Sequence, residues 1–489
     1  MSSSISPFSI THPNLSRGAR NTLLLYLAIS AVVFLLMMIF GTTLRYEQGQ
    51  WLGLGPEYFY QIMTAHGVGM VGISGLAASA VMWFFLSRHV QLSTSILIAN
   101  LGFFLVGVVL ILGSIFIGKF AAAWTFLYPL PAKSMGVWSN HAAASFLLGL
   151  LLVGVGFLLL YLDIAIAIMK IFGNLAKALG WPQLFSNSQE DAPPPPTVVA
   201  STMVLIVNIA GIAAGAVVLV LSLVNVYNPA YELDPLLVKN LIFFFGHVFI
   251  NATIYQAVIA VYEILPVYTQ RPWKSSKVFL AAWTASTLMV ISVYPHHLLM
   301  DFAMPTWALV MGQIISYMSG FPVLVVTAYG ALTFVYRSGI KWDVTSGLLM
   351  LSMMGWACGV IPAIVDGTIS VNNVMHNTLW VPGHFHIYLL LGVVPMIFGF
   401  MYYLAQSNGE KLSFIDTLAY WMYLLAGMGF VTMFLLGGKE SVPRRWAAHM
   451  NEWIAYDQIA AVFATLVVVS VLVFAIRFLT RISKVNIAS

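Results

Sequence analysis

Residues 374–390, VMHNTLWVPGHFHIYLL, place two histidines, His384 and His386, inside an apolar run long enough to cross a bilayer. Ionisable side chains at membrane depth usually have a function. Because an α-helix turns about 100° per residue, residues two apart point roughly 200° apart and cannot bind one metal ion. We therefore expect His384 and His386 to serve two different centres. The alternative for an isolated pair is that both are packing histidines with hydrogen-bond partners.

Histidines recur in three other apolar segments. They are His66 in YFYQIMTAHGVGMVGISG, His247 in FFFGHVFINATIYQ, and the adjacent His296 and His297 in SVYPHHLLM. Each imidazole at membrane depth needs a polar partner where water is absent. Packing alone is a poor explanation for six of them, whereas iron, copper and zinc all accept imidazole ligands.

Composition assigns the chain to the membrane. Of its 489 residues 60% are hydrophobic and 8% charged, with a mean hydropathy of +0.91, whereas soluble domains are about half apolar. The single cysteine, Cys358, excludes an internal disulfide, a cysteine-ligated iron–sulfur cluster and a copper site with two thiolates. The net charge of +5 contains no basic run, which argues against nucleic-acid binding.

Apolar runs of spanning length recur along the whole chain. They cover residues 22–44, 59–86, 94–118, 139–169, 199–227, 239–268, 276–299, 304–336, 345–366, 379–405, 413–437 and 458–480. We therefore predict an all-α integral membrane protein of about twelve transmembrane helices, forming a single domain over residues 1–489.

Charges at the ends of these runs indicate the orientation. An even number of helices puts both termini on one side, and that side carries Arg88, Lys177, Arg271, Lys274, Arg337, Lys341, Lys411, Arg477, Arg481 and Lys484. The other side carries Glu47, Glu57, Glu232, Asp234, Asp301, Glu440, Glu452 and Asp457. The positive-inside rule thus predicts cytoplasmic termini in a bacterial or archaeal cytoplasmic membrane. Residues 1–21 lack the pattern of a secretory signal.

One long connection lies on the predicted inner side. Residues 176–197 end in SNSQEDAPPPPT, which predicts a solvated, partly extended proline-rich loop.

With this orientation all six histidines fall in one layer, in the outer half of the membrane. Their number suits two haems and one further metal: His66 and one histidine of 379–405 on a six-coordinate haem iron, the other on a second haem, and His247, His296 and His297 as a three-histidine site. A transporter whose histidines line a pathway is the alternative from another class. Pathway residues would be expected at several depths, so the single layer favours metal centres.

Four motifs carry a family resemblance: HGVGM, YPHH, HNTLWVPGHFH and SVPRRW. In their order and spacing the chain resembles subunit I, the catalytic subunit, of the haem–copper oxidase superfamily, over nearly all its length. WVPGHFH after HNT, and the segment from His247 to VYEILP, look most like the B-type branch.

The resemblance implies roles for particular residues. His66 and His386 are similar to the axial ligands of a low-spin haem, and His384 to the proximal ligand of a high-spin haem. His247, His296 and His297 match the ligands of a non-haem metal, usually copper. Arg444 and Arg445 match an arginine pair that meets haem propionates, as guanidinium forks bind carboxylates. Because the chain itself has no thiolate copper site, we expect a cupredoxin-like subunit II or a periplasmic cytochrome c as electron donor.

The chain departs from the family next to its first metal ligand. The segment of A- and B-type oxygen reductases resembles HPxVY, with a tyrosine one turn on that is linked to a histidine and supplies an electron and a proton for splitting O–O. Here it reads HVFIN, so Asn251 faces the same metal. Asparagine cannot form a radical, although its amide can ligate or hydrogen-bond. Tyr255 lies on nearly the same face but about 12 Å further along.

This substitution decides the predicted reaction. Reduction of O2 needs four electrons at one site, whereas 2 NO + 2 e⁻ + 2 H⁺ → N2O + H2O needs two, which two reduced metals supply. One B-type-like group of nitric oxide reductases resembles this chain in carrying asparagine there. We predict a nitric oxide reductase with His247, Asn251 and His384 at the reaction site; the alternative is a cytochrome c oxidase-type terminal oxidase reducing O2 to water.

Protons from the inner side need a path. Tyr262 and Glu263, at the inner end of 239–268, are the candidates for proton transfer, since buried carboxyl groups often serve as relays. The alternative for Glu263 is that it reaches the aqueous edge near Arg271.

Overall fold

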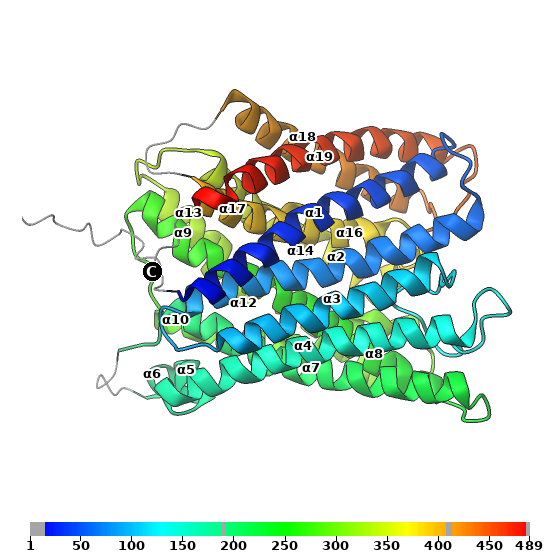
Figure 1. Ribbon diagram of the computed structural model, residues 1–489, viewed down its shortest axis with the longest axis horizontal. Coiled ribbons are helices and arrows are strands. Elements are labelled where there is room, and N and C mark those ends of the chain that lie inside the picture. The colour runs from blue at the N-terminus through cyan, green and yellow to red at the C-terminus, as the bar shows by residue number, and fades with distance from the viewer. Residues whose placement is uncertain (1–14, 187–191, 407–412, 486–489) are drawn as a thin grey trace, which may run out of the picture.

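The computed structural model describes residues 15–186, 192–406 and 413–485. It is an all-helical bundle in which twelve spans are long and apolar enough to cross a membrane (Figure 1). Each predicted span end lies within five residues of an observed one. The predicted fold class is confirmed. Three parts of the chain with sequence predictions lie outside the described residues: 1–14, 187–191 of the proline-rich loop, and Lys411.

Eight of the spans are single helices. They are α1 (Arg17–Gln48), α2 (Gly55–Leu86), α3 (Thr94–Phe116), α4 (Asn140–Phe172), α7 (Pro196–Tyr227), α14 (Val344–Asp366), α18 (Phe414–Lys439) and α19 (Ile454–Arg481). Polar caps extend several of them beyond the apolar run; Ser16, for example, accepts a hydrogen bond from the Ala19 amide at the start of α1.

The other four spans are interrupted. The sixth joins α8 (Pro235–Ala257) to α9 (Ile259–Thr269), and the seventh joins α10 (Lys277–Ser292) to the 3₁₀ turn η1 (Tyr294–Leu298). The eighth contains α11 (Thr306–Ser319), α12 (Phe321–Val323), the π-helix η2 (Leu324–Tyr329) and α13 (Gly330–Val335), and the tenth contains α16 (Trp380–Tyr388), the π-helix η3 (Leu389–Val393) and α17 (Val394–Ala405). Three of these interrupted spans carry five of the six predicted histidine ligands. One of the three, the tenth, contains a π-helix, a feature frequent at functional sites.

Short helices occupy some connections: α5 (Leu175–Ala178), α6 (Trp181–Phe185), α15 (Ile369–Met375) and the final 3₁₀ turn η4 (Ile482–Lys484). The first half of residues 176–197 is therefore folded, and the stretch predicted to be partly extended, SNSQEDAPPPPT, begins just after it. The Trp181 indole N–H donates to Thr284 Oγ1 at 3.1 Å, which fastens this connection to α10.

The first and last spans meet and close the bundle. Figure 1 shows the start of α1 and the end of α19 at the same end of the molecule, where an Arg20 Nη donates to the Val485 carbonyl at 2.7 Å. Near their other ends Arg45 and Asp457 form a buried ion pair of 3.0 Å. Asp457, counted above with the loop charges of the outer side, is thus a buried residue of α19. α2 and the sixth and tenth spans are the most enclosed of the twelve.

Candidate functional site

One cavity of about 440 Å³ brings most of the predicted site residues together. Its lining includes all six predicted histidines, Asn251, Arg444 and Arg445. These residues come from α2, α8, η1, α16 and the connection between α18 and α19.

His66 and His386 face each other across one part of the cavity. Their rings are nearly parallel, at 13°, with centroids 6.3 Å apart. His66 Nδ1 donates to the Met37 carbonyl and His386 Nδ1 to the Pro382 carbonyl, both at 2.6 Å. This leaves both Nε2 atoms free to bind a metal.

The spacing fits one iron between the two rings. A metal about 2.0–2.1 Å from each nitrogen, with each nitrogen about 1.1 Å from its ring centre, requires centroids about 6.3 Å apart. The residues thus fit the bis-histidine haem that the resemblance implies. A Cβ at Gly41 would lie 2.7 Å from His66 Cε1, so this glycine makes room for the ring.

His247, His296 and His297 form a compact group whose candidate ligand atoms all lie within 4.8 Å of one another. His247 Nδ1 is 3.1 Å from His297 Nε2, and His296 Nδ1 is 3.0 Å from Ser316 Oγ. Asn251 Nδ2 lies 2.9 Å from His247 Nε2 and donates to the His247 carbonyl at 2.9 Å. His247 Nδ1 with the Nε2 atoms of His296 and His297 would suit a three-imidazole metal site.

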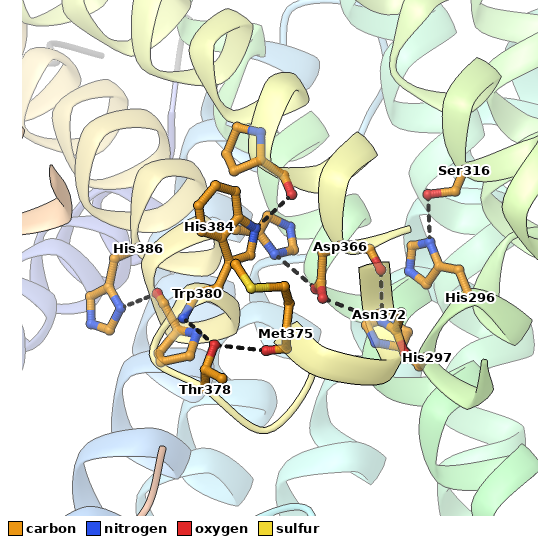
Figure 2. Close-up of polar contacts among 12 residues, drawn as sticks. His296, His297, Ser316, Asp366, Asn372, Met375, Thr378, Trp380, His384 and His386 are labelled. Atoms are coloured by element: carbon orange, nitrogen blue, oxygen red, sulfur yellow. Dashed lines mark hydrogen bonds and ion pairs between the residues drawn. The ribbon is translucent and has the colours of Figure 1, made fainter. Parts of the chain in front are cut away.

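His384 lies on the other side of α16 from His386. Figure 2 shows His386 apart from the other labelled histidines, and His384 on the side of Asp366, His296 and His297. Its Nδ1 is 3.6 Å from Asp366 Oδ2, which is too long for a hydrogen bond. The geometry therefore agrees with two separate centres for the two histidines of α16.

Arg444 and Arg445 line the cavity at the end of the bundle opposite the termini. The Arg444 amide donates to the Asn377 carbonyl at 2.9 Å, and Arg445 Nη2 donates to Thr125 Oγ1 at 3.1 Å. Burial lowers the pKa of Arg444 to about 10, and the neighbouring Arg445 charge acts in the same direction. Among the described residues neither guanidinium has a carboxylate partner within 4.0 Å, so the pair fits anionic groups such as propionates.

Tyr262 and Glu263 belong to different polar groups. The Tyr262 hydroxyl is 2.5 Å from Thr327 Oγ1, whereas Glu263 forms an ion pair of 2.8 Å with Arg88 and accepts a hydrogen bond from Thr197. The structure does not bring the two side chains into one path. The basic partner of Glu263 is Arg88 and not Arg271, which donates to backbone carbonyls of residues 333–337.

Sequence reasoning missed other residues of the cavity, among them Trp124, Arg45 and Asp366. A Cβ at Gly67 would lie 2.9 Å from the Trp124 ring, and one at Gly246 would lie 3.4 Å from it. Each of these glycines neighbours a predicted ligand in the chain, which was the available signal. Arg45 lies over the Phe434 ring at 4.7 Å, and Phe434 packs on His386.

Comparison with known proteins agrees with this architecture. The chain is similar to cytochrome c oxidase subunit 1 of Thermus thermophilus, with 25% identity over 266 residues that are 50% of this chain and 47% of that protein. It is also similar to cytochrome c oxidase subunit 1 of Synechocystis sp., with 23% identity over 452 residues, 88% of this chain and 77% of that protein. The first of these matches spans about half the length of the relative.

A solved structure shares the fold. It is a heme-copper terminal oxidase dimer determined by cryo-EM, with a TM-score of 0.77 and 19% identity over 97% of this chain and 85% of that chain. Residues 21–484 match the family described as Cytochrome C and Quinol oxidase polypeptide I. The chain therefore belongs to this family, the haem–copper oxidase subunit I family.

Proposed function

We propose that this chain is the B-type-like catalytic subunit of a respiratory nitric oxide reductase, which converts 2 NO, two electrons and two protons into N2O and water. The observation that carries the proposal is Asn251, whose amide nitrogen lies 2.9 Å from His247 Nε2. By the resemblance, oxygen reductases carry a redox-active tyrosine at this place. Asparagine can orient a ligand or a metal-bound imidazole by hydrogen bonding, but it cannot supply an electron.

The electron requirement favours nitric oxide. When bound, the two haems and the non-haem metal supply electrons and open coordination positions. Two electrons suffice for N–N coupling, whereas breaking O–O to the level of water takes four. In the alternative, an O2-reducing terminal oxidase, another side chain of the cavity must provide the missing electron. Tyr255 lines the cavity between the Trp283 and Trp356 rings and is the first to examine.

The proposed roles of the residues follow from their positions. His66 and His386 would hold the low-spin haem, His384 the high-spin haem, and Arg444 and Arg445 the propionates. His247, His296 and His297 would hold the non-haem metal, with copper as the expected ion. Two pairs of residues on the sixth span, Tyr255 with Tyr262 and Gln256 with Glu263, are the candidates for a proton path toward the end that carries the termini.

Electron supply is expected from the opposite end. With cytoplasmic termini in a bacterial or archaeal cytoplasmic membrane, the loop of Arg444 and Arg445 faces outward. A cupredoxin-like subunit II or a periplasmic cytochrome c would then donate to the low-spin haem.

Electrode measurements of NO and O2 consumption, made in parallel, test the proposed reaction. One preparation of the purified complex is assayed for NO and O2 consumption with the same reductant. We expect ready conversion of NO to N2O and slow O2 consumption. Fast reduction of O2 to water with negligible NO turnover would overturn the proposal.

Asn251→Ala tests the residue itself. Losing the contact to His247 should lower NO turnover about 10- to 100-fold, as for other groups that support metal ligands, while the haem spectra stay unchanged. Asn251→Tyr alone should not give a good O2 reductase, because the histidine link and a proton path would also have to form.

A further inference from the structure

We propose that Asp366 is a positioning residue for the high-spin haem: its carboxylate accepts the Nδ1–H of His384 and makes this imidazole a stronger electron donor to the iron. The inference rests on the proposed role of His384 as the proximal ligand. It adds a carboxylate partner that the motifs around His384 do not contain.

The first observation is an unpaired donor. His384 Nδ1 is buried and has no hydrogen-bond partner among the described residues. Its nearest acceptor on an acidic side chain is Asp366 Oδ2, at 3.6 Å. A metal-ligating histidine almost always donates its other N–H to a carboxylate, a carbonyl or water. A movement of less than about 1 Å brings this pair to charge-assisted hydrogen-bond distance.

The second observation is that Asp366 is held in place for this contact. The buried Asn372 amide donates to the Asp366 carbonyl at 2.6 Å and to Oδ1 at 3.3 Å. One carboxylate oxygen is therefore fixed from α15, and Oδ2 remains directed at His384. Figure 2 shows this chain of contacts from His384 through Asp366 to Asn372.

The third observation concerns the acidic side chains of the cavity. Among the described residues that line it, Asp366 is the only carboxylate. Arg444, from the connection between α18 and α19, is the cation whose charge interacts with it. A carboxylate at this position raises the basicity of the ligand.

The next residue ties the same segment to the other metal site. A Cβ at Gly367 would lie 2.5 Å from Ser316 Oγ, and this hydroxyl lies 3.0 Å from His296 Nδ1. The end of α14 therefore lies beside a proposed ligand of each centre: Asp366 is next to His384, and Gly367 leaves room for the hydroxyl that contacts His296.

The test uses the purified, haem-loaded complex and two spectroscopic readouts: the iron–histidine stretching frequency of the ferrous high-spin haem, and the midpoint potentials of both haems. Asp366→Asn should shift the stretching frequency downward and the high-spin potential upward, with the low-spin potential unchanged. Asp366→Glu should restore part of both shifts. Asp234→Asn is the matched control, because Asp234 is an exposed N-cap of α8 that asparagine can replace.

An unchanged frequency and potential in Asp366→Asn would overturn the inference. If that variant does not retain haem, the same measurement is made on the unaltered protein. Its iron–histidine stretching frequency should exceed that of a haem with a neutral, unpaired imidazole. Equal frequencies would overturn the inference. His384→Ala separates the two proposals. If the high-spin haem survives this change, the ligand assignment fails; if the haem is lost while Asp366→Asn shows no shift, only the carboxylate partner fails.

Discussion

His384 and His386 are two residues apart and serve opposite sides of one helix. His386 packs between Phe430 and Phe434 and faces His66, while His384 lies beside Asp366. A helix gives this separation from backbone geometry alone. A short motif can thus place two irons close together without sharing a ligand.

Single substitutions should separate the two haems. His386→Ala should remove the low-spin haem from the reduced-minus-oxidised spectrum and leave the high-spin one, and His384→Ala should do the reverse, because each imidazole binds one iron. The CO-binding spectrum reports the high-spin haem independently. An unchanged spectrum in either variant would refute the ligand assignment.

At the residue scale, the sequence predicted site residues correctly where a polar side chain stands in an apolar run. Imidazoles in apolar runs stand out, and the structure brings all six of them to one cavity. Asp366 was not predicted as a site residue because a carboxylate at the end of a span resembles an ordinary loop charge. Asp457 was misjudged for the same reason, since only the fold reveals that Arg45 comes 3.0 Å from it.

At the scale of elements, contacts of α1 shape the part of the cavity beside His66, where we propose the low-spin haem. Gly41 faces the His66 ring, and Met37 of the preceding turn supplies the carbonyl that orients it. The absence of a side chain at Gly41 leaves room for the ring, and the Met37 carbonyl orients it. Neither is visible in the pattern of apolar residues.

Gly41→Ala should weaken this pocket. The new methyl would lie 2.7 Å from His66 Cε1, and such overpacking costs about 1–3 kcal/mol, so low-spin haem content and thermal stability should both fall. The matched control is Gly113→Ala in α3, where nothing lies within 4 Å and the helix gains about 1 kcal/mol. Equal haem content in both variants would show that His66 does not depend on this space.

The sixth span presents two polar faces, and they can be told apart. Tyr262 contacts Thr327, and Glu263 contacts Arg88 and Thr197. Tyr255, seven residues before Tyr262, lines the cavity, whereas Gln256, seven before Glu263, donates to the Tyr161 hydroxyl at 2.6 Å. The tyrosine face therefore leads to the reaction site more directly.

Tyr262→Phe should slow NO reduction by about 100-fold if this face carries protons, with unchanged haem spectra. Glu263→Gln keeps the shape of the side chain and removes the charge paired with Arg88, so we expect lower thermal stability but a much smaller loss of turnover. The reverse ranking in steady-state rates would assign the path to the Glu263 face.

At the scale of the whole molecule, hydropathy was sufficient for the twelve spans, because helix length in a bilayer is set by thickness. The interruptions of four spans were not predicted, because hydropathy reports the length of an apolar run and not its local helix geometry. Prolines at 295, 322 and 395 lie in or beside three of them. Packing of α1 against α19 likewise required the fold.

Orientation gives a test for the complete complex. In right-side-out vesicles, a membrane-impermeant reductant or donor cytochrome added outside should reduce the low-spin haem, since the loop of Arg444 and Arg445 lies at the end opposite the termini. The same donor enclosed inside should not. A tag fused to either terminus should resist external protease; cleavage of both tags in intact vesicles would invert the proposed topology.

The Arg45–Asp457 pair also sets an order of events during biosynthesis. The two residues are 412 positions apart, so at about 5–20 residues per second Arg45 is made some 20–80 s before its counter-charge. Until then the Arg45 guanidinium, which lines the cavity beside His66 and His386, has no carboxylate beside it. The charge balance of the proposed low-spin haem site therefore depends on a residue made after every proposed histidine ligand.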